Sequence, residues 1–318
     1  MKITKKSRIG KYWHILVEAG KGFSEDRVPK LSAALAYNTI FSLAPMLLLV
    51  LIVGGAVYGE AAVQGKVFSE LKDFVGADAA SQIQEIIKRI QFQQNSFAAT
   101  VISIIALVIG ATGIFVEIQD SLNLIWGVRP RAKKGFIKLL LNRAISFSMI
   151  IGLGFLLIVS LIVNALLLGL SSILIRYLPD LPVDLLDLIN TGLIFLVISF
   201  LFSVIFKMLP DVKIRWKQVW PGAFLTAALF MLGKFLIGLY IGSNNTVSLY
   251  GAAGSIIILL LWIYFSAFIL YFGAEFTRAY IEYNGEKIVP NTYAEYSDKR
   301  LLEELRKEHD HLKEKGEA

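Results

Sequence analysis

Six long apolar runs constrain the fold of this chain more than any other feature. Five of them contain no Asp, Glu, Lys, Arg or His, and the sixth contains only Lys234. Each run is close to or longer than the roughly 20 apolar residues that cross a hydrocarbon core of about 30 Å. The sequence therefore predicts an all-α, polytopic membrane protein with six transmembrane helices. The runs cover residues 31–59, 97–116, 144–172, 188–206, 218–241 and 249–274.

The overall composition agrees with a membrane location. Hydrophobic residues make up 56% of the chain and charged residues 18%, whereas a soluble domain carries about one-quarter charged residues. A soluble fold would also need several buried helices of more than about 20 residues, although globular helices average roughly 11–12. A soluble globular protein is therefore disfavoured.

Lys and Arg are concentrated in alternate gaps between the runs. The four segments expected on one side of the membrane hold 26 of the 32 basic residues, and the three gaps on the other side hold 5. Cytoplasmic loops carry the excess of Lys and Arg, so both termini are predicted to be cytoplasmic. This asymmetry explains the net charge of +7 without a nucleic-acid partner, and it makes membrane lipids the expected partners. The basic segments are 1–30, 117–143, 207–217 and 275–318.

The predicted organisation has a cytoplasmic N-terminal segment (1–30), a six-span membrane domain (31–283) and a charged cytoplasmic tail (284–318). In the N-terminal segment, helical spacing places several apolar residues on one face. That pattern fits a helix lying in the membrane interface, and it fits a packed cytoplasmic turn equally well. These residues are Ile9, Trp13, Leu16, Val17 and Gly20. The spans, extended where helical periodicity continues, are about 31–59, 97–126, 144–172, 188–206, 218–241 and 249–281.

Ionisable and polar side chains in the spans are the candidate functional residues, because charge is costly at membrane depth. Lys234 either lines a polar cavity or extends its stem toward the outer surface. Glu117, Asp120 and Glu275 lie at the predicted cytoplasmic edge, where they form either a salt-bridge network or a gate or ion-coupling site. Arg278 stands three residues after Glu275, the spacing of a helical ion pair. The full candidate transport and gating set is Asn38, Pro45, Glu117, Gln119, Asp120, Asn123, Lys234, Glu275 and Arg278.

The sequence offers little for catalysis. It has no cysteine, and its histidines are His14, His309 and His311. It contains no HExxH, GxSxG or phosphate-binding loop motif. We therefore expect no enzyme activity, no catalytic residue, no metal and no cofactor. Small residues in the last two spans permit close helix packing and leave a homo-oligomer possible.

Three blocks of sequence carry a resemblance to a known family. AALAYNTIFSLAP at 33–45, GIFVEIQDSLNLIW at 113–126 and the last-span blocks WIYFSA at 262–267 and FGAEFTR at 272–278 resemble signatures of the YihY/BrkB family of bacterial inner-membrane proteins. The resemblance covers about 25–285 and implies a multi-pass inner-membrane protein with both ends inside. Asn38 and Phe268 depart from the Tyr and Gln common in the family. If those positions line a polar path in relatives, that path is altered here.

The resemblance also frames the functional hypotheses. The family is linked to virulence and envelope functions and to suspected transport. It carries the older label ribonuclease BN, which the residues of this chain do not support. The leading hypothesis is a transporter or permease-like protein for an unidentified small ion or lipid-type substrate, with Pro45 bending the first span. The alternative is a non-transporting, virulence-associated envelope scaffold.

Overall fold

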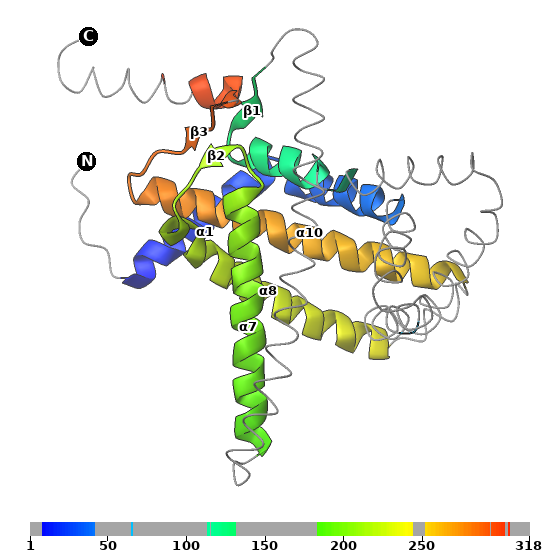
Figure 1. Cartoon of the computed structure of the whole chain (residues 1–318). Coiled ribbons are helices and arrows are strands. Elements are labelled where there is room, and N and C mark those ends of the chain that lie inside the picture. The colour runs from blue at the N-terminus through cyan, green and yellow to red at the C-terminus, as the bar shows by residue number, and fades with distance from the viewer. Residues whose placement is uncertain are drawn as a thin grey trace. The chain divides into compact units, whose positions relative to one another are not determined.

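The computed structural model describes residues 8–41, 65, 113–114, 116–131, 183–243, 252–292, 294–302 and 305. Within these residues the chain is mostly helical (Figure 1). The helices are α1 (Arg8–Glu25), α7 (Val183–Met208), α8 (Trp216–Ser243) and α10 (Ala252–Tyr283), and residues 28–41 and 116–125 are also helical. The third predicted span, and much of the first two, lie outside the described residues.

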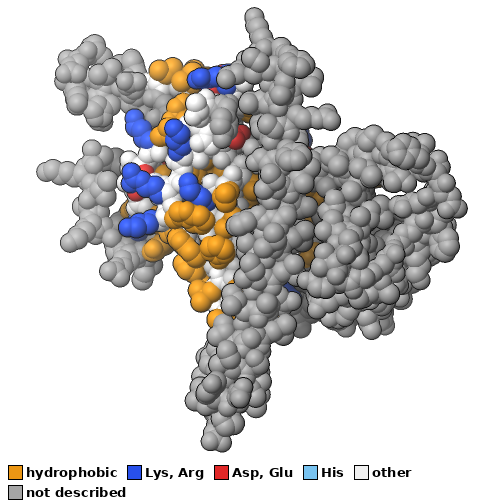
Figure 2. Space-filling view, viewed as in Figure 1, with side chains coloured by type: hydrophobic (Ala, Val, Ile, Leu, Met, Phe, Trp, Pro, Cys, Tyr) orange, Lys and Arg blue, Asp and Glu red, His pale blue; other side chains and the backbone are white. Residues whose placement is uncertain are grey.

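Three of the described helices are long and apolar enough to cross a membrane. The qualifying segments are Thr191–Met208 in α7, Trp216–Leu236 in α8 and Leu259–Tyr283 in α10. They overlap the last three apolar runs of the sequence, which are thereby confirmed as parts of helices of membrane-spanning length. Large hydrophobic side chains are exposed along them, as a lipid-facing surface requires. Figure 2 shows a hydrophobic area with Lys and Arg side chains gathered beside it.

The chain divides into two compact units, which are described separately. Unit 1 consists of Met1–Val28, Gln119–Met231 and Ile269–Ala318, and unit 2 of Pro29–Ile118 and Leu232–Phe268. Unit 1 therefore contains α1, α7, the first part of α8 and the last part of α10.

Close packing of α8 on α10 in unit 1 depends on two reciprocal glycine–threonine contacts. A Cβ on Gly222 would overlap the side chain of Thr277, and a Cβ on Gly273 would overlap that of Thr226. Both threonines are fully buried. Each hydroxyl donates at 2.7 Å to the glycine carbonyl four residues earlier in its own helix. Small residues thus bring the two backbones together without leaving a polar group unsatisfied.

One face of α1 packs on α10. Ile15 and Ala19 form a buried cluster with Phe276, and Leu16 packs against that cluster. Trp13 and Val17 remain exposed, with 69% of the Trp13 surface accessible. The apolar face predicted from helical spacing is therefore split between a packed side that includes Leu16 and an exposed side.

Short strands at the end of unit 1 depart from the predicted all-α fold. β1 (Val128–Pro130) pairs antiparallel with β4 (Ala294–Tyr296), with Val128 opposite Tyr296. β2 (Val212–Lys213) pairs antiparallel with β3 (Val289–Pro290), with Lys213 opposite Val289. The start of the predicted cytoplasmic tail is thus held on the turns that follow residues 116–125 and α7. Strands of two or three residues are too short to produce a recognisable period in the sequence.

Candidate functional site

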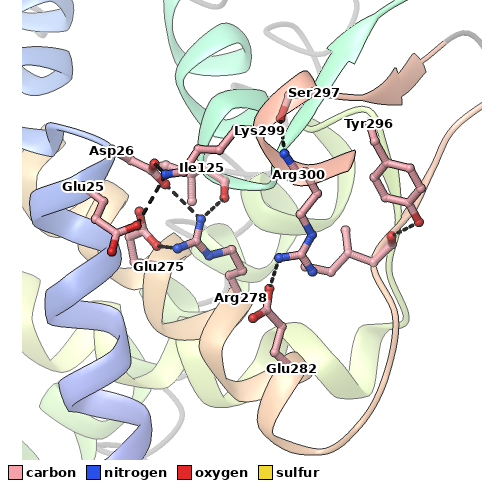
Figure 3. Close-up of polar contacts among 11 residues, drawn as sticks. Glu25, Asp26, Ile125, Glu275, Arg278, Glu282, Tyr296, Ser297, Lys299 and Arg300 are labelled. Atoms are coloured by element: carbon pink, nitrogen blue, oxygen red, sulfur yellow. Dashed lines mark hydrogen bonds and ion pairs between the residues drawn. The ribbon is translucent and has the colours of Figure 1, made fainter. Parts of the chain in front are cut away.

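Arg278 on α10 joins three separate parts of unit 1 (Figure 3). Its Nη1 donates to the Asp26 carboxylate at 2.9 Å and to the carbonyl oxygen of Ile125 at 2.6 Å. Its Nη2 forms an ion pair with Oε2 of Glu275 at 2.9 Å. Asp26 follows α1 and Ile125 ends the helix at 116–125, where unpaired carbonyls favour a cation. We call Asp26, Glu275 and Arg278 the charged junction.

The charged junction is largely removed from solvent. The exposed fractions of the side chains are 0% for Glu275, 7% for Asp26 and 20% for Arg278. The Glu275–Arg278 contact is an ion pair without hydrogen-bond alignment, and neither Glu275 oxygen has a hydrogen-bond partner among the described residues. A buried carboxylate in this state has lost hydration that its neighbours only partly replace.

Gly22 of α1 provides the space that Glu275 and Arg278 occupy. A Cβ at this position would overlap both the carboxylate and the guanidinium group. By contrast, Gly20, two residues earlier in α1, has no atom within 4 Å of its Cβ position. The approach of α1 to the charged junction therefore requires glycine at position 22.

The start of the C-terminal tail reaches the same junction. Lys299 donates to Asp26 at 3.0 Å and to Glu25 at 3.4 Å, and Arg300 lies 2.7 Å from Glu282 of α10. Partial burial lowers the pKa of Lys299, but its hydrogen bond and charge interaction with Asp26 outweigh this effect and leave the pKa raised. Asp26 therefore connects a cation of the tail to a cation of a membrane-length helix.

A polar cleft of about 170 Å³ lies beside the junction. Its walls come from α1, from the turn after residue 125, from α10 and from the tail. Acidic and basic side chains are present in equal numbers, so the cleft has no clear preference for an anion or a cation. The charged lining residues are Glu18, Lys21, Glu25, Asp26, Arg278, Glu282, Lys299 and Arg300.

A second polar contact in unit 1 holds the helix at 116–125 on the turn after α7. The side-chain amides of Asn123 and Gln119 donate to the Asp211 carboxylate at 2.9 and 3.2 Å. The Asp211 amide donates back to Asn123 at 2.8 Å, and its carbonyl accepts from the Asn291 amide at 2.8 Å. Gln119 and Asn123 thus anchor a turn that also binds β3.

The remaining predicted site residues do not join the charged junction in the described structure. In unit 2, Asn38 donates to Glu117 at 2.8 Å. Asp120 and Lys234 are exposed, and Pro45 lies outside the described residues. Glu117 belongs to unit 2, whereas Asp120 and Glu275 belong to unit 1, so the expected grouping of these three acids stays a prediction. A role in transport or gating stays a prediction for all of these residues.

Three important residues are missing from the predicted set: Asp26, Asp211 and Lys299. The sequence offered one usable signal, because Asp26 directly follows the end of α1 and Asp211 stands three residues after the end of α7. Among the described residues, no group of three or more His, Asp or Glu is arranged to hold a metal ion.

Comparison with known proteins identifies the family of this chain. A family model described as "Virulence factor BrkB" matches residues 19–295. The chain belongs to this family. The resemblance seen in the sequence motifs is thereby confirmed.

Related proteins agree that this BrkB-family chain is an integral membrane protein. A UPF0761 membrane protein of Alteromonas mediterranea is 28% identical over 261 residues, which cover 81% of this chain and 84% of that protein. A relative of the same name in Haemophilus influenzae is 27% identical over 272 residues, covering 84% and 95%. One in Stenotrophomonas maltophilia is 29% identical over 293 residues, covering 88% of this chain but 64% of the longer relative. No solved structure matches the chain.

Proposed function

We propose that this BrkB-family chain is a six-span inner-membrane protein with both termini in the cytoplasm. We further propose that it acts as a transporter or permease-like protein for a small ion or a lipid-type substrate. The alternating distribution of Lys and Arg supports the topology. The charged junction would act as a closure at the cytoplasmic end of the membrane domain.

The observation that carries this proposal is the buried, incompletely hydrogen-bonded pair of Glu275 and Arg278. A buried ion pair is weak support for stability, because well-packed apolar residues often replace such pairs without loss. Ionisable groups in membrane segments are, by contrast, typical of substrate and ion pathways. Arg278 also joins three chain segments, so any relative movement of these segments must change its contacts.

Flux measurements on reconstituted protein test the proposal. The full chain is placed in liposomes and assayed with protons, K⁺, Na⁺ and Cl⁻, and with a fluorescent phosphatidylethanolamine that reports lipid movement between leaflets. Glu275→Gln is compared with Glu295→Gln, because Glu295 forms a more exposed ion pair with Arg129 and neither residue lines the polar cleft. Removing one partner of a buried pair costs about 3–5 kcal/mol. Because the pair is proposed to hold the closed state, even half of this cost would shift the equilibrium between closed and open states by about tenfold or more, and we expect Glu275→Gln to change flux accordingly. Glu295→Gln should leave the flux unchanged.

Two results would contradict this proposal. The absence of flux for every probe in folded wild-type protein would remove the transport function and favour the envelope scaffold. Equal flux in folded Glu275→Gln and wild-type protein would instead remove the charged junction from the mechanism.

A further inference from the structure

The turn between α7 and α8 must lie at a membrane surface. The two membrane-length segments end at Met208 and begin at Trp216, so only residues 209–215 separate them. Such a short connection cannot carry its side chains far from the lipid headgroups. This placement follows from the two spans alone and does not depend on the proposed transport function.

Basic side chains on this turn point outward because β2 imposes a two-residue alternation. Val212 and Ile214 are buried, whereas Lys213 and Arg215 are exposed, and Lys217 is exposed in the first turn of α8. The side chain of Gln218 accepts from the Arg215 amide at 2.6 Å and fixes the start of the helix. We call Lys213, Arg215, Trp216 and Lys217 the basic turn surface.

The positive charge of this surface is not neutralised within the part of the chain that the structure describes. None of its three cations makes an ion pair there. The two acidic residues near this turn bind other partners. Asp211 accepts hydrogen bonds from Asn123 and Gln119, and Glu286 accepts one from Gln218. The surface therefore presents three cations that are available to an anionic partner.

Exposed apolar groups accompany these cations. Trp216 is 43% exposed and stacks on Phe200 of α7, with ring centroids 6.4 Å apart and planes 3° from parallel. Met208 is 65% exposed, and Val289, which pairs with Lys213, is also exposed. Tryptophan beside basic residues is typical of the boundary between hydrocarbon and headgroups. A free phosphate ion has no apolar part that could contact these exposed side chains.

We propose that the basic turn surface binds the headgroup of an anionic phospholipid. The three cations contact the phosphate-bearing headgroup, while Trp216 and Met208 contact the adjoining acyl chain region. Basic clusters at the cytoplasmic ends of membrane helices are suited to this role. The proposal gives this turn a lipid-binding function separate from the charged junction.

Native mass spectrometry of the full chain in zwitterionic detergent provides the test. The protein is titrated with phosphatidylglycerol, with phosphatidylcholine of the same chain length, and with inorganic phosphate. The variant K213Q/R215Q/K217Q is compared with K21Q/R27Q/K30Q, which removes three exposed charges around the end of α1. Each basic residue near an anionic surface contributes about fivefold to binding, so the first variant should bind phosphatidylglycerol on the order of a hundredfold more weakly. The second variant, and the charge-retaining K213R/R215K/K217R, should bind like wild type.

Several outcomes would overturn the proposal. Undiminished phosphatidylglycerol binding by folded K213Q/R215Q/K217Q would exclude the surface. An equal loss in K21Q/R27Q/K30Q would show a general effect of net charge. Equal affinity for phosphatidylcholine, or full competition by inorganic phosphate, would exclude an anionic lipid as the ligand. Loss of binding in the charge-retaining variant would show that the cations are not what the lipid recognises.

Discussion

Replacing Arg278 by methionine offers the sharpest test of the charged junction. The substitution keeps a long, flexible side chain but leaves the carboxylates of Glu275 and Asp26, 0% and 7% exposed, without their shared guanidinium. Removing one partner of a buried ion pair costs about 3–5 kcal/mol. We expect Arg278→Met to lower the free energy of unfolding by about this amount. The double variant Glu275→Gln/Arg278→Met should recover part of the loss, because it removes one stranded charge.

The measurement is unfolding of purified protein in mixed detergent micelles, followed by intrinsic tryptophan fluorescence. Arg129→Met is the matched control, because Arg129 also forms two ion pairs, with Glu295 and Asp298, but is 48% exposed. An exposed pair contributes about 0–1 kcal/mol, so the control should lie close to wild type. If Arg278→Met and Arg129→Met lower the free energy of unfolding by the same amount, the charged junction does not behave as a buried ion pair, and the reasoning is refuted.

Three further predictions follow from the same contacts. Gly20→Ala should raise the free energy of unfolding by about 0.5–1 kcal/mol, because an exposed helical glycine has no neighbour there. Gly22→Ala should lower it by about 1–3 kcal/mol through overlap with Glu275 and Arg278, and equal effects of the two substitutions in denaturation curves would refute this contrast. Asp211→Asn should lower stability by about 1–3 kcal/mol, because an amide cannot accept from both Asn123 and Gln119 in the same way; Asp298→Asn, at an exposed pair, serves as its control. Lys299→Gln should speed limited proteolysis of the tail. In wild type, about 1 M salt should do the same by screening the exposed Lys299–Glu25 pair. If neither change alters the cleavage rate, the strands alone hold the tail.

The features that the sequence predicted correctly are those that depend on near neighbours. Apolar length is a local property, so α7, α8 and α10 followed from the long apolar runs. The Glu275–Arg278 pair followed from helical spacing alone. The end of the helix near Gly127 was also predicted, and this glycine adopts a positive φ of 67° that ends a helix readily.

The features that the sequence could not predict depend on distant partners. Asp26 lies 252 residues from Arg278 and 273 from Lys299, and no local pattern relates them. The same holds for Asp211 and Asn123, which are 88 residues apart. The packed side of α1 also depends on a distant partner, because Ile15 and Ala19 are buried with Phe276 although neither belongs to the predicted apolar face, whereas Trp13 of that face is exposed.

The glycine–threonine contacts between α8 and α10 have a consequence for how this pair of helices assembles. Gly222 meets Thr277 while Thr226 meets Gly273, so the helices run antiparallel at this point and the fit is specified twice. Sliding one helix by a single turn in one direction would place Thr226 against Thr277, and in the other direction it would place Gly222 against Gly273. The first arrangement would clash and the second would leave a void. In an apolar solvent, where hydrophobic burial does not guide helices into register, this spacing of large and small residues selects one alignment of the hairpin over its nearest alternatives.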